Sequence, residues 1–138
     1  ASPAFEGDPA RKIPANVYRP EDTQNFTALL AEFRRQLDEY GKQTGQHYLL
    51  TIAAPAGAQN YSKMELNKIH PYLDWINVMT YDMHGSWDAK GPTNFHAPLY
   101  SSPKDPAAAP NNVSVDSVIT AYLNMGIPPE KLVMGLPF

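Results

Sequence analysis

Blocks of apolar and polar residues follow one another along this chain and predict helices and strands in turn. The clearest block is "RPEDTQNFTALLAEFRRQLDEYG", residues 19–41, where apolar residues recur every three or four positions, as is typical of an amphipathic helix. The apolar stripe consists of Phe26, Leu29, Leu30, Phe33, Leu37 and Tyr40. Pro20 suits the first helical position and Gly41 suits the end, so we expect the helix to lie between them.

Shorter apolar runs predict strands. Residues 47–57, "HYLLTIAAPAG", form such a run bounded by Gly and Pro, and residues 131–138, "KLVMGLPF", form another. Between them lies "WINVMTYD", residues 75–82, which is rich in β-branched and aromatic residues and has no polar alternation. This third pattern predicts a strand that is buried on both faces.

Two further helices are expected between the strands. Ser62 and Glu65 are spaced as a capping box, which predicts a helix that begins at Ser62. Residues 114–126, "SVDSVITAYLNMG", predict another helix, with Ser114 as its cap and Gly126 as its end. The residues expected to face inward from this helix are Val115, Val118, Ile119, Tyr122 and Leu123.

Helices and strands therefore alternate, which predicts right-handed βαβ units and a parallel sheet. A doubly wound open sheet and an eight-fold (β/α)8 barrel both fit this order. No Gly-rich phosphate loop follows any expected strand, which disfavours a nucleotide-binding open sheet. Three expected strands are too few to close a barrel, so a barrel would have less than half of its strands in this sequence.

The composition of the 138 residues is typical of a soluble globular protein, with 43% hydrophobic residues, 18% charged residues and a formal charge of −3. No cluster of Lys and Arg marks a nucleic-acid footprint, so we expect no nucleic-acid partner. No run approaches the roughly 20 apolar residues of a spanning helix, so we expect no membrane partner. Cysteine is absent and the 4 histidines show no metal-ligand spacing, so neither a metal nor another cofactor is expected.

The candidate chemistry lies where the strand "WINVMTYD" ends, because both architectures bind ligands at the carboxyl ends of their strands. Tyr81 can donate a hydrogen bond there, and Asp82 can accept one from a sugar hydroxyl or an amide. Met79 shares the face of Tyr81 and offers a soft wall, and Ala53 lies near the end of the preceding strand. Trp87 offers a flat apolar face of the kind on which sugar rings stack.

Each of these residues also has a purely structural interpretation. A Tyr at a strand end is commonly part of the core, and an Asp before a turn commonly caps its own backbone. Met79 alone is typical of a core, and Trp87 can simply cover the edge of a sheet. The sequence has neither a GxSxG elbow nor a cysteine nucleophile, so local motifs alone leave both interpretations open.

Taken in order, "YLLTIAAPAG", "LDWINVMTYDMHGSW", "NFHAPLY" and "KLVMGLPF" resemble the family 18 glycoside hydrolases, in particular the bacterial chitinases. The similarity runs from about Asn16 to Phe138, and its most specific signature is M-x-Y-D, here Met79 to Asp82. The resemblance implies an α/β fold that is a partial (β/α)8 TIM barrel, with these strands as the fifth, sixth and seventh. It also implies that residues 1–138 are part of a single catalytic domain, incomplete at both ends.

The resemblance further implies an enzyme that hydrolyses chitin, the β-1,4-linked polymer of N-acetylglucosamine, with retention by substrate assistance, an exception to the two-carboxylate scheme. In that family the substrate's acetamido oxygen attacks the anomeric carbon. The resemblance makes Tyr81 and Asp82 catalytic, because Tyr81 matches the residue that hydrogen-bonds the acetamido group and Asp82 matches the carboxylate that holds the distorted sugar. Met79, Trp87 and Ala53 are expected to bind substrate. Chitin or chitooligosaccharides are the expected partners of a secreted, monomeric parent protein.

One part of the family pattern has no match: the D-x-x-D-x-D-x-E motif that carries the general acid is absent. The sequence also lacks an initiator Met, so we expect an internal piece of a longer chain. Since a general acid contributes about 10²–10⁴ in rate, we expect the isolated segment to be inactive. Two alternatives of the same fold remain: a chitin-binding lectin that has lost the acid, and an endo-β-N-acetylglucosaminidase, which the "HAPLY" stretch disfavours.

Overall fold

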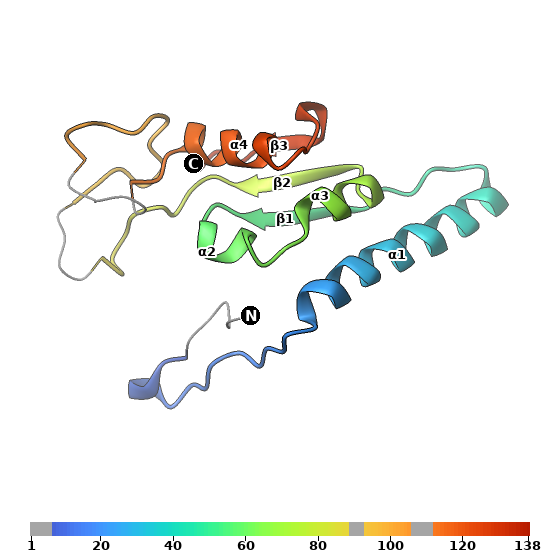
Figure 1. The fold of residues 1–138 in the computed structure, drawn as a ribbon, viewed down its shortest axis with the longest axis horizontal. Coiled ribbons are helices and arrows are strands. Elements are labelled where there is room, and N and C mark those ends of the chain that lie inside the picture. The colour runs from blue at the N-terminus through green and yellow to red at the C-terminus, as the bar shows by residue number, and fades with distance from the viewer. Residues whose placement is uncertain (1–6, 89–92, 106–111) are drawn as a thin grey trace.

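A three-stranded parallel sheet lies at the centre of the structure. The structure is a computed structural model that describes residues 7–88, 93–105 and 112–138. Its strands lie side by side in chain order (Figure 1): β1 (Thr51–Pro55), β2 (Trp75–Met79) and β3 (Leu132–Met134). Each strand falls inside one of the apolar runs that predicted it and is shorter than that run. The predicted parallel sheet is therefore confirmed.

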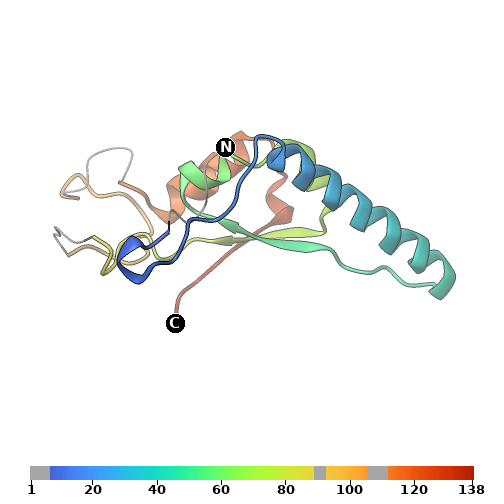
Figure 2. The same ribbon diagram turned by 90° about the horizontal axis from the view of Figure 1, so that it is seen from below.

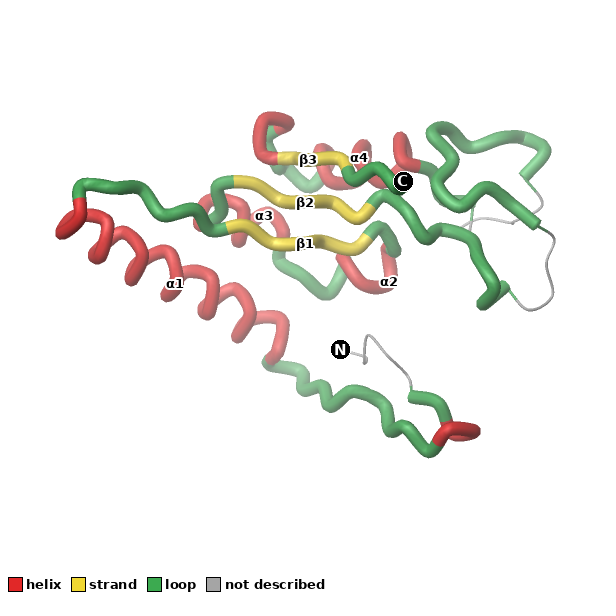
Figure 3. Tube along the Cα trace, turned by 180° about the vertical axis from the view of Figure 1, so that it is seen from behind, coloured by secondary structure: helices red, strands yellow, loops and turns green. Residues whose placement is uncertain are grey.

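The helices connect the strands and cover one face of the sheet. They are α1 (Asp22–Thr44), α2 (Ala58–Tyr61), α3 (Leu66–Ile69) and α4 (Val115–Asn124), with 3₁₀ turns at Pro9–Arg11, His70–Tyr72 and Pro129–Lys131. Helix α1 runs along the β1 side of the sheet (Figure 1). Helices α2, α3 and α4 all lie on the same face of the sheet, whereas no described helix lies over the opposite face (Figures 2 and 3).

The two faces of the sheet differ in burial because successive side chains of a strand point to opposite sides. The face under the helices forms the core, whose buried members are Leu30, Ala54, Leu66, Ile69, Leu73, Ile76, Val78, Val118, Tyr122 and Ile127. On the other face Ala53 is exposed, and Asn77 and Met79 are only partly buried. The prediction that β2 is buried on both faces is wrong for the described chain, because no described element covers this open face.

Helix α1 begins and ends later than its sequence predicted. Pro20 lies in a turn before the helix, and Gly41 lies inside it and is buried. A Cβ atom added at Gly41 would lie 2.4 Å from the carbonyl oxygen of Gln46, so the returning chain requires glycine there. Gly45 ends the helix in the left-handed conformation, with φ 70° and its N–H donating to the Gly41 carbonyl. The predicted end at Gly41 is therefore wrong.

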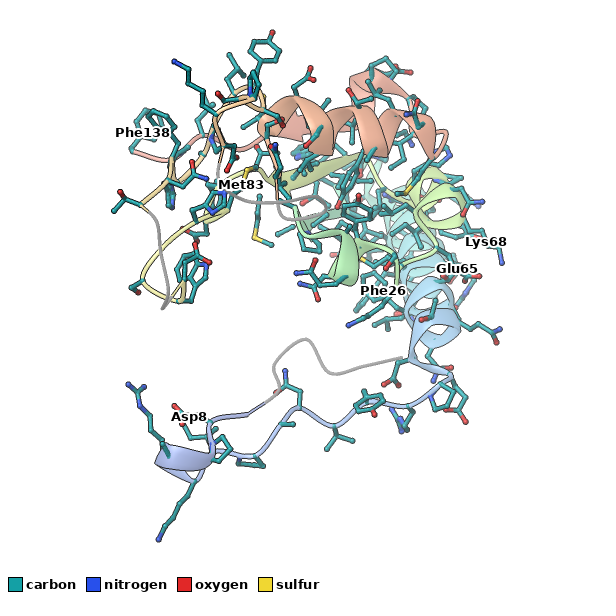
Figure 4. The ribbon with its side chains drawn as sticks, turned by 60° about the vertical axis from the view of Figure 1, so that its left-hand side comes forward. Asp8, Phe26, Glu65, Lys68, Met83 and Phe138 are labelled. Atoms are coloured by element: carbon teal, nitrogen blue, oxygen red, sulfur yellow. The ribbon has the colours of Figure 1, made fainter. Side chains whose placement is uncertain are left out.

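The predicted capping box at Ser62 is also wrong. Ser62 follows α2 as its C-terminal cap, and α3 begins only at Leu66. The Glu65 carboxylate instead accepts hydrogen bonds from Thr27 Oγ1 at 2.7 Å and from Lys68 Nζ at 2.5 Å. The Thr27 bond ties the start of α3 to α1, whereas the Lys68 bond stays within the first turn of α3, on the side of the molecule where Figure 4 labels both residues.

Helix α4 begins and ends as predicted. Ser114 Oγ accepts from the Ser117 N–H at 3.2 Å, and Ser117 Oγ accepts from the Ser114 N–H at 2.9 Å, so two serines form a reciprocal capping box. Gly126 follows the helix with φ 85°. Tyr122 is fully buried, and its hydroxyl donates to the Pro55 carbonyl at 2.8 Å, which joins α4 to the end of β1. Leu123 is 39% exposed, so its predicted inward position is wrong.

A carboxylate joins the amino-terminal ends of β1 and β2 to α1. Asp74 Oδ2 accepts the N–H of Leu50 at 2.6 Å and lies 3.4 Å from Arg34 Nη1, and Asp74 Oδ1 lies 2.5 Å from His47 Nε2. The Asp74 N–H donates to the Leu50 carbonyl at 2.8 Å. Burial opposes ionisation of Asp74, but the bonds from Leu50 and His47 and the charge of Arg34 hold its pKa below the ordinary value.

The substitution Asp74→Asn should lower the free energy of unfolding by about 1–3 kcal/mol. The Asn amide has one NH2 donor in place of a carboxylate oxygen and no charge, so it cannot accept from Leu50 N–H, Arg34 and His47 as Asp74 does. Urea denaturation measures this loss. The pKa of Asp74 is lowered in the folded state, so the extra stability of the wild type is full above the unfolded pKa of about 4 and is lost as pH falls through the folded pKa.

Asp38 is the matched control, since it pairs with Arg34 at 2.6 Å but is 50% exposed. Asp38→Asn should cost less than about 1 kcal/mol, and equal losses in both variants would contradict this account.

Candidate functional site

The predicted site residues lie where β2 leaves the sheet. Thr80, directly after the strand, is fully buried, and its Oγ1 donates to the Gly135 carbonyl at 2.7 Å. The Gly135 N–H in turn donates to the Val78 carbonyl at 2.9 Å. These two bonds fix the exit of β2 against the segment that follows β3. They therefore fix the position from which the chain continues into Tyr81 and Asp82.

Tyr81 is half-buried against the backbone after β3. A Cβ atom added at Gly135 would lie 2.7 Å from Tyr81 Cε1 and 2.7 Å from the Val78 carbonyl oxygen. Only glycine therefore lets the phenol ring and β2 approach this closely. Gly135 was not among the predicted site residues, although an isolated glycine within the apolar run "KLVMGLPF" is a signal for such an approach.

Asp82 takes the left-handed backbone conformation, with φ 55°, which among the described non-glycine residues it shares with Lys12 alone. Asp is one of the few residue types that tolerate this conformation. The turn leaves the Asp82 side chain 64% exposed, and His96 Nε2 contacts Asp82 Oδ1. The carboxylate is thus accessible to a ligand and has a partner from a distant part of the chain. His96 was not among the predicted site residues.

Met79 and Ala53 both belong to the open face of the sheet. In the register of the parallel pair, Ala53 lies opposite Asn77 and Pro55 lies opposite Met79. Met79 is partly buried, whereas Ala53 is exposed. The structure therefore brings Met79 and Ala53 to one surface, beside the exit of β2. Their contact with substrate stays a prediction.

The loop after Asp82 carries Trp87 and is organised around a buried histidine. The Trp87 indole is 59% exposed and folds over Gly85, where an added Cβ would lie 2.4 Å from Trp87 Cη2. His84 is only 9% exposed, with Nδ1 3.3 Å from Asp88 Oδ2 and Nε2 3.3 Å from Asn94 Nδ2. The loop thus presents an aromatic face to solvent, and its role as a sugar platform stays a prediction.

The described residues form neither a metal site nor a membrane-spanning helix. Within residues 7–88, 93–105 and 112–138, no group of three or more His, Asp or Glu side chains has the arrangement of a metal site. None of the helices in the described part of the chain is both long and apolar enough to cross a bilayer.

Comparison with known proteins gives a consistent result. The sequence profile of the family "Glycosyl hydrolases family 18" matches residues 7–138. Chitinase A1 of Niallia circulans is 43% identical over 129 residues, which are 91% of this chain and 18% of that protein. Chitinase 1 of Aphanocladium album is 43% identical over 116 residues, 83% of this chain and 26% of that protein. The chain thus spans only 18% to 26% of the length of these relatives.

A solved structure extends the likeness to three dimensions. Chitinase ChiA74 from Bacillus thuringiensis superposes with a TM-score of 0.84 at 50% sequence identity. The match covers 91% of this chain and 20% of that chain. The fold described above is therefore similar to a part of that larger protein.

Replacing Gly135→Ala should displace the Tyr81 ring and lower the free energy of unfolding by about 1–3 kcal/mol, because the new methyl group overlaps the ring and the Val78 carbonyl. Ring-proton NMR shifts of Tyr81 and urea denaturation measure the two effects. Gly57→Ala is the matched control: Gly57 has φ −70°, and an added Cβ meets only the flexible Gln59 side chain. The control should change stability by less than about 1 kcal/mol, and an unmoved Tyr81 in Gly135→Ala would contradict the prediction.

Proposed function

The chain belongs to family 18 of the glycosyl hydrolases, and from this premise we propose that it is one part of the catalytic domain of a chitinase. The family fold is a TIM barrel. We assign β1, β2 and β3 to its fifth, sixth and seventh strands, with residues 1–138 inside a single domain that is incomplete at both ends. The parallel sheet, its helices on one face and its open opposite face support a barrel segment, because a barrel strand turns one face to the helices and one to the interior. The strand numbers rest on the order of the family motifs along the sequence.

The observation that carries the proposal is the position of Tyr81 and Asp82 at the carboxyl end of the central strand. TIM-barrel enzymes place their reacting groups at this end of the sheet. Tyr81 is fixed by packing on Gly135, whereas the Asp82 carboxylate projects outward and is 64% exposed. The Tyr81 hydroxyl is a hydrogen-bond donor on a fixed ring, and the Asp82 carboxylate is an accessible acceptor. Together they suit a ligand that carries an amide.

In the proposed reaction the substrate's acetamido oxygen attacks the anomeric carbon, the glycosidic C–O bond breaks, and water later opens the cyclic intermediate with net retention. The Tyr81 hydroxyl donates to the acetamido group, and the Asp82 carboxylate holds the distorted sugar and stabilises the positive charge that develops. Met79 lies beneath the sugar with Ala53 nearby, and Trp87 offers its exposed face to sugars on the leaving-group side.

The proton for the leaving group comes from outside this segment. The family supplies it from the Glu of D-x-x-D-x-D-x-E, a motif that the 138 residues do not contain. We therefore place the general acid elsewhere in the full-length enzyme, which we propose is a secreted monomer acting on chitin and chitooligosaccharides. The segment described here supplies one wall of the substrate cleft.

In the full-length enzyme, Asp82→Asn should lower turnover of a labelled chitooligosaccharide by about 10²–10³, because the neutral amide stabilises the developing positive charge poorly. Thermal unfolding should be nearly unchanged, since the side chain is exposed. Asp116→Asn is the control, an exposed carboxylate in the first turn of α4 whose loss should leave turnover within about twofold. Turnover near the wild-type value in Asp82→Asn would remove Asp82 from the mechanism.

The isolated 138-residue chain should release no labelled product from chitooligosaccharides, because the general acid that contributes about 10²–10⁴ in rate is absent. Chromatography of the products after prolonged incubation measures this. The full-length enzyme assayed in parallel is the positive control. Hydrolysis by the purified segment would show that an acid within it had been overlooked.

A further inference from the structure

We propose that His96 is a positioning residue that holds the Asp82 carboxylate in the orientation used by the cleft. This inference rests on the proposed function, since it requires Asp82 to act on the substrate. It assigns a role to a residue on the long connection between β2 and α4, well separated in sequence from the M-x-Y-D stretch. The contact joins residues 14 positions apart.

The need for a positioning group follows from the exposure of Asp82. A carboxylate that is 64% exposed samples several rotamers unless another group selects one of them. His96 Nε2 contacts Asp82 Oδ1 and lies 3.2 Å from the Asp82 backbone nitrogen. The same imidazole nitrogen therefore lies within hydrogen-bond distance of both the backbone N–H and the carboxylate of Asp82. The imidazole therefore selects one carboxylate orientation relative to the left-handed turn of the backbone.

The backbone is fixed at His96 and shortly after it, so the imidazole is held in place by more than its own contact. The His96 carbonyl accepts the N–H of Met83 at 2.9 Å, directly beyond Asp82. Further along, the carbonyl of Pro98 accepts the N–H of Val115 at 2.9 Å. The stretch from His96 to Pro98 therefore bridges the exit of β2 and the start of α4.

The residue two positions before His96 adds a third anchor. Asn94 Nδ2 donates to Asp105 Oδ1 at 2.8 Å and lies 3.3 Å from Nε2 of the buried His84. Asn94 Oδ1 accepts the N–H of Phe95 at 2.8 Å, which fixes the orientation of its amide. A catalytic group needs support of this kind, because misplacement by about 1 Å can cost 10²-fold in rate.

A second His–Asp pair in the same chain provides a matched comparison. His47 Nε2 lies 2.5 Å from Asp74 Oδ1 at the opposite, amino-terminal end of β2. His47 is 59% exposed and His96 is 47% exposed, so the two imidazoles are similarly accessible. Asp74, however, is only 18% exposed and is engaged by backbone, so its pair supports folding and lies away from the site.

The test compares two amides of different reach in the full-length enzyme. His96→Gln puts an amide nitrogen near the position of Nε2 and should keep kcat within about threefold of wild type. His96→Asn is one methylene shorter and should lower kcat about 10- to 100-fold with little change in KM, because Asp82 is still present but misplaced. Initial rates with a fluorogenic chitobioside measure both constants, and thermal unfolding should show similar midpoints for the two variants. His47→Asn should leave kcat unchanged.

A double-mutant cycle separates this inference from the proposed function. If His96 acts through Asp82, His96→Asn combined with Asp82→Asn should be no slower than Asp82→Asn alone. Rate losses that multiply, or a His96→Asn variant with wild-type kcat while Asp82→Asn is impaired, would overturn the role of His96 and leave the proposed function intact. Wild-type turnover in Asp82→Asn would overturn both.

Discussion

The pairing of β2 with both of its neighbours is the constraint on which the rest of the structure depends. Its register sets Asn77 opposite both Ala53 and Val133, in one row across the sheet. Because side chains alternate along a strand, this single register sends Ile76 and Val78 into the core beneath the helices and leaves Asn77 and Met79 on the open face. A slip of one residue would exchange the two sets, so the hydrophobic core and the composition of the open face are determined together.

The two ends of β2 show how one chemical group serves different purposes in different surroundings. Asp74 precedes the strand, is largely buried, and is surrounded by Leu50 N–H, Arg34 and His47, so its charge is compensated. Asp82 follows the strand, is mostly exposed, and has the His96 imidazole beside its carboxylate. A compensated charge at the edge of the core contributes to folding, whereas an exposed carboxylate remains accessible to a ligand. The same contrast accounts for the different consequences expected from removing either carboxylate.

Local patterns in the sequence predicted what depends on local physics. The apolar runs predicted the three strands and their parallel order, and Ser114 and Gly126 predicted the bounds of α4, because strand propensity and helix capping are properties of neighbouring residues. The failures involve contacts that the pattern of apolar and polar residues does not reveal. Gly41 is explained by the close approach of the Gln46 carbonyl after the helix, and Glu65 by its bond to Thr27 in α1, 38 positions away. Neither partner can be identified from spacing alone. The open face of β2 was missed for a related reason, since an apolar run does not tell which of its faces a helix will cover.

The candidate site follows the same division. A continuous signature, M-x-Y-D, names Tyr81 and Asp82, but the groups that orient them come from far along the chain. Gly135, which makes room for the Tyr81 ring, also accepts the hydrogen bond of Thr80 across 55 positions, and His96 reaches Asp82 across 14. A turn that holds Asp82 in the left-handed conformation with its side chain in solvent is unfavourable for an isolated peptide and needs such support. The short signature therefore names the proposed reacting groups, whereas their orientation depends on the sheet and on the connection that brings His96 back to the end of β2.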